Sequence, residues 1–285
     1  MGPVPERPVL VAPDAFKRTF RAAQVAGAIG RGLERAGLMP PDLCPLAGGG
    51  EGTMEALLLA LGGEAVGLEV HDSLGRPHQA AFGLLEDGGT AVIEMAAASS
   101  LGVVSQGDRA STYGTGELIC AAVDAGAEVV LLGAGGSAPT DGGAGALAAI
   151  EEHGGLRGAR IVVLCDAPTA GGEAGLWAAH GAVLEQGARF VLSALDFDAR
   201  MRAARAVVTG EGRLDEQTLE GGLVGEIGTR ARQAGVPLHA IVGADALDPF
   251  GKRIIDLQVV QEATDLEQIE AAGETLGRGL ADGRW

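Results

Sequence analysis

Six short apolar runs constrain the fold of this chain more than any other feature of its sequence. They are bounded by Gly, Pro or Asp and read PVLVA (8–12), AVIEM (91–95), VVLLG (129–133), IVVLC (161–165), AVVTG (206–210) and LHAIVG (238–243). Their apolar character is continuous rather than alternating, which is typical of strands covered on both faces in parallel sheets. We therefore expect several buried parallel strands.

Helical stretches lie between these runs. Residues 19–36 repeat apolar side chains at helical spacing and stop before Gly37, and residues 54–61 follow Thr53 as a candidate N-cap. Residues 117–124 and 224–233 have the same character. Strands that alternate with helices predict an α/β fold with mostly parallel sheets.

One region, residues 64–95, breaks this alternation. It reads as short strands joined by turns, with a hairpin connection at residues 87–89. We interpret it as the entry to a second domain inserted into the first. The predicted domains are residues 1–64 plus 201–285 as an outer α/β domain and residues 65–200 as an inserted α/β domain.

The charge of the chain limits its partners. The formal net charge is −17 at pH 7, whereas nucleic acid or an anionic membrane would require a basic face. An anionic ligand would need a locally positive pocket.

The basic residues are mostly arginines, because Lys17 and Lys252 are the only lysines. A lysine retained in a motif can mark a need for a compact ammonium group.

Cysteines and histidines give no functional signal. The three cysteines include no CxxC pair, and the five histidines show no metal-ligand spacing. The sequence also shows no signal peptide and no apolar segment long enough to span a bilayer. We expect a soluble cytoplasmic protein with reduced cysteines.

Glycine-rich loops next to strands or helices carry the candidate chemistry. They are VAPDAFKRT (11–19), PLAGGGEGT (45–53), GAGGSAPTDGG (133–143) and TGEGRLDEQT (209–218), with TYGTGE (112–117) as a weaker fifth. In open α/β sheets, ligands bind beyond the carboxyl ends of the strands, where such loops gather. Glycine lets backbone N–H groups approach an anion closely, so these loops predict a phosphate site.

Two familiar phosphate-binding motifs have to be tested against this interpretation. A Walker A loop is absent, since Gly251-Lys252 is followed by Arg253 and has no matching upstream glycine. A dinucleotide fingerprint does match Gly133, Gly135 and Ala138, which keeps a nicotinamide-dependent oxidoreductase as one hypothesis. The helix after this loop is expected to start only at Asp141, which argues against the fingerprint.

Charged residues accompany two of the loops. Glu211, Asp215 and Glu216 flank Arg213 just after a strand, and a few carboxylates beside phosphates suit Mg²⁺. The alternative is a solvated turn capped by Thr209. Asp14 and Lys17 follow another strand and are either structural or serve as a base or metal ligand and a phosphate-binding cation.

Taken in order, the motifs resemble those of the bacterial glycerate kinase family. That family's pattern runs APDSFKGS, LADGGEGT, TSYGTGELI, GIGGSATNDGG and TGEGRLDEQT. The corresponding segments here are residues 12–19, 46–53, 111–119, 133–143 and 209–218, and IEMAAASSL (93–101) matches a further family segment. The resemblance implies a two-domain α/β kinase outside the P-loop class that phosphorylates D-glycerate with Mg-ATP, with its site between the domains.

Three departures accompany the resemblance. Gly48 stands where the family has an acid, Pro139 and Thr140 replace Thr and Asn, and Gly222 stands where the family has a lysine. The middle of the chain after residue 172 is also shorter than usual. These departures support an alternative hypothesis, a catalytically impaired relative that binds a nucleotide or a small acid.

The resemblance and the loop chemistry together give the candidate site. The cofactors are ATP and Mg²⁺, the acceptor is a small hydroxy acid, and the assembly is a monomer or homodimer. The catalytic candidates are Lys17, Asp141, Arg213 and Asp215, and the metal candidates are Asp141 and Glu211. The substrate- and nucleotide-binding candidates are Asp14, Gly49, Gly50, Glu51, Gly52, Thr53, Gly135, Gly136, Ser137, Thr209 and Gly210.

Overall fold

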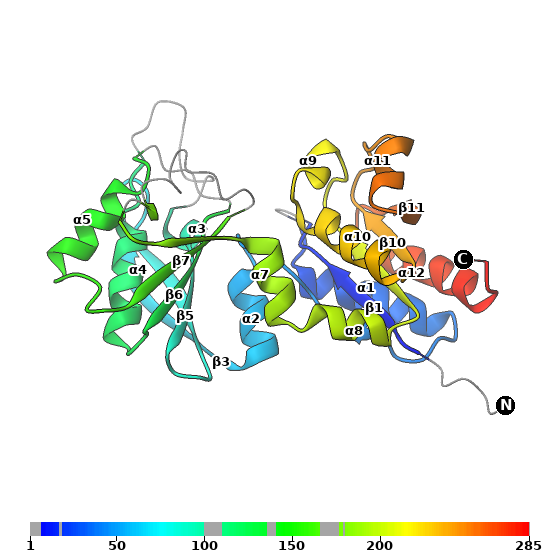
Figure 1. Ribbon diagram of the computed structural model, residues 1–285, viewed down its shortest axis with the longest axis horizontal. Coiled ribbons are helices and arrows are strands. Elements are labelled where there is room, and N and C mark those ends of the chain that lie inside the picture. The colour runs from blue at the N-terminus through cyan, green and yellow to red at the C-terminus, as the bar shows by residue number, and fades with distance from the viewer. Residues whose placement is uncertain are drawn as a thin grey trace. The chain divides into compact units, whose positions relative to one another are not determined.

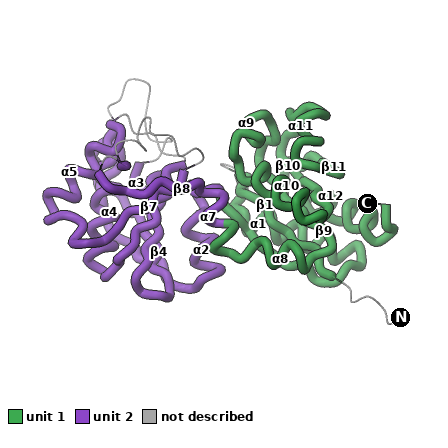
Figure 2. Tube along the Cα trace, in the orientation of Figure 1, with its two compact units in different colours: residues 1–47, 192–285 green, residues 48–191 purple. Residues whose placement is uncertain are grey.

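The computed structural model describes residues 7–16, 19–99, 110–135, 141–165, 177–178 and 180–284. It divides into two compact units, each with its own sheet (Figure 2). Unit 1 is residues 1–47 with 192–285, and unit 2 is residues 48–191. These bounds differ from those of the two predicted domains, whose assignment stays a prediction. The predicted α/β class with two mostly parallel sheets is confirmed.

The sheet of unit 1 is entirely parallel. Its five strands lie in the order β11-β10-β9-β1-β2. Their bounds are β1 Val9–Pro13, β2 Asp42–Leu43, β9 Ala206–Gly210, β10 Leu238–Val242 and β11 Leu257–Glu262. Ala12 lies opposite Thr209 and Pro13 opposite Gly210, so the carboxyl ends of β1 and β9 coincide. Every residue of β1, β9 and β10 is buried, as the continuous apolar runs predict.

Helices cover this sheet. They are α1 (Ala22–Arg35), α8 (Phe197–Ala203), α9 (Glu216–Leu219), α10 (Leu223–Ala234), α11 (Pro249–Ile254) and α12 (Leu266–Ala281). α1 and α12 lie side by side (Figure 1) and come so close that a Cβ on Gly32 would lie 2.1 Å from the carbonyl oxygen of Glu270. α1 starts three residues later than predicted, because the N–H groups of Thr19 and Phe20 donate to the carbonyl of Phe16 in a preceding turn.

The sheet of unit 2 is mixed. Its six strands lie in sequence order. The pairs β3–β4 and β4–β5 are antiparallel, and β5 to β8 are parallel. The strands are β3 Gly63–His71, β4 Pro77–Leu85, β5 Thr90–Glu94, β6 Val129–Gly133, β7 Arg160–Cys165 and β8 Val183–Gln186. The predicted turn at residues 87–89 does connect β4 to β5, because Asp87 Oδ1 accepts the N–H groups of Gly89 and Thr90.

Helices flank this second sheet as well. They are α2 (Thr53–Leu61), α3 (Met95–Ala98), α4 (Tyr113–Asp124) and α5 (Ala144–Glu152), and α7 (Gly187–Ala194) contains the boundary between the units. Phe82, Ile93, Leu118, Leu132 and Trp177 share the core of unit 2. In the part of the chain that the structure describes, no helix combines the length and the apolar character needed to cross a bilayer.

Candidate functional site

In unit 1, two of the predicted loops meet at the carboxyl edge of the sheet. The N–H of Asp14, directly after β1, donates to the carbonyl oxygen of Gly210 at 2.8 Å. The buried hydroxyl of Thr209 donates to the carbonyl oxygen of Ala12 at 2.9 Å. Because β1 and β9 are neighbouring parallel strands, Asp14 is held beside the start of the 209–218 motif.

The glycine at position 210 has a steric cause. A Cβ there would lie 2.3 Å from the carbonyl oxygen of Ile241, at the end of the next strand. No real Cβ tolerates that distance, so the close approach of β10 requires glycine at this position. The requirement comes from the protein's own backbone.

The carboxylates of the 209–218 motif are held by a short network. Thr218 donates its hydroxyl to Glu211 Oε1 at 2.7 Å and accepts the N–H of Asp215 at 3.2 Å. Asp215 caps α9 through the N–H of Gln217 at 3.0 Å. The Nε of Arg213 donates to Asp215 Oδ2 at 3.0 Å, while 63% of its side chain stays exposed. The segment therefore presents an oriented but accessible guanidinium beside two fixed carboxylates.

A third loop, after β10, packs against this motif. Leu214 donates its N–H to Ala244 at 2.9 Å and accepts that of Ala246 at 2.8 Å. Within this loop, Asp245 Oδ2 lies 2.5 Å from the Nζ of Lys252 on α11. The sequence interpretation did not include Asp245, because neither its loop nor its lysine matched a motif.

In unit 2, the glycine-rich loops contact each other. A Cβ on Gly50 would lie 2.9 Å from the Cα of Gly135, and a Cβ on Gly133 would lie 2.9 Å from the carbonyl oxygen of Gly49. Gly49 is also in close contact with Gly187, because a Cβ on Gly49 would lie 2.6 Å from the Cα of Gly187. Backbone-to-backbone packing therefore accounts for the missing side chains at these positions.

The N-terminus of α2 binds a carboxylate of the same unit. Glu94, at the end of β5, accepts the N–H of Met54 at 2.8 Å and a backbone hydrogen bond from Gly52. Burial raises the pKa of Glu94, and the neighbouring charges of Glu51 and Glu55 raise it further, against the two hydrogen bonds. Sequence analysis missed this residue, although its position at the end of a buried strand was a usable signal.

Asp141 joins the 112–117 and 133–143 motifs. Its carboxylate accepts the backbone N–H groups of Thr112 (2.8 Å), Gly143 (3.0 Å) and Gly145 (3.0 Å). The Thr112 hydroxyl lies 3.2 Å from both of its oxygens and accepts the N–H of Ala146. Asp141 thus ties the start of α4 to the start of α5.

The remaining predicted residues differ in exposure, and some lie outside the described part of the chain. Thr53 is fully buried at the start of α2, whereas Glu51 is exposed. Lys17, Gly136 and Ser137 lie outside the described residues. Among the described residues, no group of three or more His, Cys, Asp or Glu side chains is arranged to hold a metal ion. The described candidates are thus divided between the two units.

Comparisons of the sequence and of the fold with known proteins agree with each other. The model of the glycerate kinase family matches residues 9–154 and 159–277. A crystal structure assigned to glycerate kinase 2 of Salmonella typhimurium LT2 superposes with a TM-score of 0.79 and 27% identity, and the match covers 98% of this chain and 99% of that one.

Curated relatives match over part of their length. The glycerate kinase of Bacillus subtilis strain 168 is 47% identical over 148 residues, which is 50% of this chain and 38% of the relative. The glycerate 2-kinase of Escherichia coli K12 is 41% identical over 150 residues, which is 50% of this chain and 39% of the relative. These matches thus span less than half the length of the relatives.

Proposed function

The chain belongs to the glycerate kinase family, and on that premise we propose that it transfers the γ-phosphoryl group of ATP to a small hydroxy acid, with D-glycerate as the first candidate. The observation that carries the proposal is the pairing of Asp14 with Gly210, which holds two family-like motifs at one sheet edge. Neighbouring strand ends of this kind are where α/β proteins bind ligands.

Arg213 supports phosphoryl transfer by its exposure and its orientation. Asp215 holds one side of the guanidinium, and the exposed remainder is available to a phosphate. A positioned cation stabilises the charge that spreads over the transferring phosphoryl group. We assign the same role to Lys17, and we assign acceptor binding to Asp14 in unit 1 and to residues 49–53 in unit 2.

The roles of the acids follow from their contacts. Asp215 lies beside Arg213 and is our candidate for the base that accepts the acceptor's hydroxyl proton. Asp141 already accepts three backbone N–H groups, which favours a role in positioning the 133–143 loop. The backbone N–H groups of Gly135, Gly136 and Ser137 remain our candidates for binding phosphate.

Mg²⁺ is compatible with these residues. Mg²⁺ commonly takes only one or two protein carboxylates and completes its shell with phosphates and water. Glu211, which Thr218 orients, is the first candidate ligand, and Asp141 is the second. When bound, the ion would neutralise phosphate charge.

A coupled assay tests the proposal directly. Purified protein is mixed with ATP, Mg²⁺ and D-glycerate, and ADP release is followed, with L-glycerate and no acceptor as controls. We expect acceptor-dependent turnover, and ³¹P NMR of the product identifies the hydroxyl that was phosphorylated. Absence of turnover with glycerate and related sugar acids would refute the kinase activity.

The wider setting is part of the same proposal. We propose a cytoplasmic protein that acts as a monomer or homodimer, with no nucleic-acid or membrane partner, since its net charge is −17. Light scattering on the eluting protein measures the assembly. A tetramer or larger species would contradict this part without affecting the proposed reaction.

A further inference from the structure

Unit 1 has a second feature suited to ligand binding, at the sheet edge opposite the candidate site. A cavity of about 530 Å³ is lined by Arg7, Arg202 and Arg205, together with alanine, glycine, valine and proline, and none of the described residues that line it is acidic. The N–H of Arg205 donates to the carbonyl of Pro8 at 2.9 Å, and that of Val207 to Pro237 at 2.9 Å. The cavity therefore lies where β1, β9 and β10 begin.

The arginines of this cavity differ from most others in the chain. Among the described residues, nine arginines form ion pairs with acidic side chains. Arg7 and Arg202 form no ion pair within the described chain. Arg205 donates to the carbonyl oxygen of Leu280 at 2.8 Å, which fixes its side chain but, among the residues that the structure describes, leaves its charge without an acidic partner. Three positive charges are thus concentrated in a chain of net charge −17.

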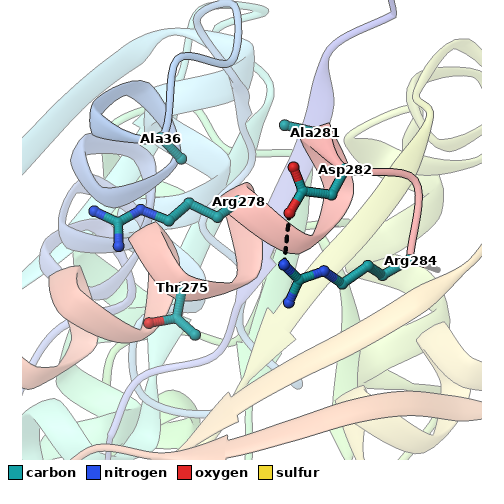
Figure 3. Close-up of a pocket in the computed structure, with 6 residues that line it drawn as sticks. All are labelled: Ala36, Thr275, Arg278, Ala281, Asp282 and Arg284. Carbon is teal, nitrogen blue, oxygen red and sulfur yellow. Dashed lines mark hydrogen bonds and ion pairs between the residues drawn. The ribbon is translucent and has the colours of Figure 1, made fainter.

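A second cavity in the same unit shows the contrast. It has a volume of about 430 Å³ and also contains two arginines, Arg278 and Arg284. There, Arg284 forms an ion pair with Asp282 at 2.7 Å, which Figure 3 marks with a dashed line. Arg278 forms an ion pair with Glu274. The charges of that cavity are compensated, so arginine lining alone does not produce a positive cavity in this protein.

The helix ends near the first cavity do not cancel its charge. The last turns of α8 and α10 lead into Ala204 and Gly235, which line it. The last turn of α12 supplies the Leu280 carbonyl that accepts the hydrogen bond of Arg205. A helix C-terminus carries roughly −0.5 of an elementary charge, so the three contribute roughly −1.5 against three guanidinium groups. A net positive charge of roughly +1.5 remains to attract an anion.

We propose that this cavity binds a small phosphate-bearing anion at a site separate from the phosphoryl-transfer site. One guanidinium group can donate two parallel hydrogen bonds to the oxygens of a phosphate. Three guanidinium groups around one cavity therefore suit a doubly charged ligand. The volume lies within the range of small-molecule sites. The ligand chemistry is a phosphate dianion, supplied either as inorganic phosphate or as the phosphate of a small ester. Since the site faces the other edge of the sheet, it would act as a regulatory or stabilising site.

Calorimetric titration tests the proposal without any assay of catalysis. Inorganic phosphate and glycerol phosphate are titrated in turn into the wild type, with a saturating non-hydrolysable ATP analogue present so that the nucleotide site is filled. The variant is the double substitution Arg7→Ala and Arg202→Ala. Arg205 is left intact because it bonds Leu280. The control is Arg160→Ala, which removes an exposed arginine of unit 2.

We expect the double variant to bind at least about tenfold more weakly, since charge-assisted hydrogen bonds are lost, and the control to bind like the wild type. Tighter binding of glycerol phosphate than of phosphate would identify an ester as the ligand, and the reverse would identify the free ion. Equal binding by the wild type and the double variant would overturn the proposal, as would no binding by the wild type. Either result is independent of whether the protein phosphorylates glycerate.

Discussion

The N–H of Met54 donates to the Glu94 carboxylate over 2.8 Å, which places a buried acid from the end of β5 at the N-terminus of α2. A helix N-terminus favours a negative charge, whereas burial opposes it. Here burial is the larger influence, so the pKa of Glu94 lies above its ordinary value of 4.5. The loop of residues 48–53 is thereby linked to the ionisation of one carboxyl group.

Glu94→Gln should change how stability depends on pH. Because the folded-state pKa is raised, the folded protein binds the proton of Glu94 more tightly than the unfolded chain does. The stability gained from this proton is fully present below pH 4.5 and is lost as the pH rises through the folded-state pKa. We expect the variant to gain stability relative to the wild type over that interval, as measured by urea unfolding at a series of pH values. A stability difference that does not vary with pH would contradict the assignment.

His239 should show the opposite dependence. Burial in β10 lowers the pKa of His239 from 6.5 to about 4. The unfolded chain then binds the proton more tightly, so stability should fall as pH drops from 6.5 towards 4, by on the order of 3 kcal/mol. His239→Gln should remove this component from urea titrations, whereas His180→Gln, at an exposed position, should keep it. An unchanged pH profile in His239→Gln would contradict this account.

The sheets were predictable because continuous apolar runs are local signals. The runs at 206–210 and 238–243 became strands buried along their whole length. The start of α1 was not predictable, since it depends on the Phe16–Phe20 turn. The network of Asp141 was also hidden, because its partner Thr112 lies 29 residues away.

The glycines of the candidate site also show what the sequence alone could not predict. The sequence predicted that Gly50 and Gly135 leave room for phosphate, whereas the described structure places their backbones against each other. Which segment comes close to a glycine is a tertiary property. Whether phosphate also binds there stays a prediction.

Gly50→Ala should destabilise unit 2. The new Cβ would lie 2.9 Å from the Cα of Gly135, and neither backbone can yield without moving its loop. We expect a loss of about 1–3 kcal/mol, as for other overpacked sites. Gly89→Ala is the matched control, because among the described residues beyond its two chain neighbours nothing lies within 4 Å of a Cβ there. Equal unfolding midpoints in urea for the two variants would contradict the contact.

Asp141→Ala should be costly for a different reason. It leaves the N–H groups of Thr112, Gly143 and Gly145 without their acceptor. Unsatisfied donors and a lost helix cap together predict a loss of about 2–4 kcal/mol. Glu151→Ala, which removes an exposed acid from α5, should stay within about 0.5 kcal/mol of the wild type in urea unfolding. A loss equally small in Asp141→Ala would show that the network contributes little.

Arg213→Ala should reduce catalysis without reducing stability. Its side chain is 63% exposed and lies beside Asp215, so the free energy of unfolding should change by no more than about 0.5 kcal/mol. If Arg213 stabilises the phosphoryl group in the transition state, kcat should fall by about 100-fold or more, with a smaller change in the KM for ATP. The coupled assay measures both constants.

Two further variants show whether the effect belongs to this guanidinium. Arg213→Lys keeps the charge but loses the planar donor pair, so partial recovery of kcat is expected. Arg253→Ala removes an exposed arginine of α11 that donates to the carbonyl of Pro249, and it should leave kcat unchanged. A wild-type kcat in Arg213→Ala would remove this residue from the transition state. An equal loss in Arg253→Ala would instead attribute the effect to net charge, since both substitutions remove one positive charge from the same unit.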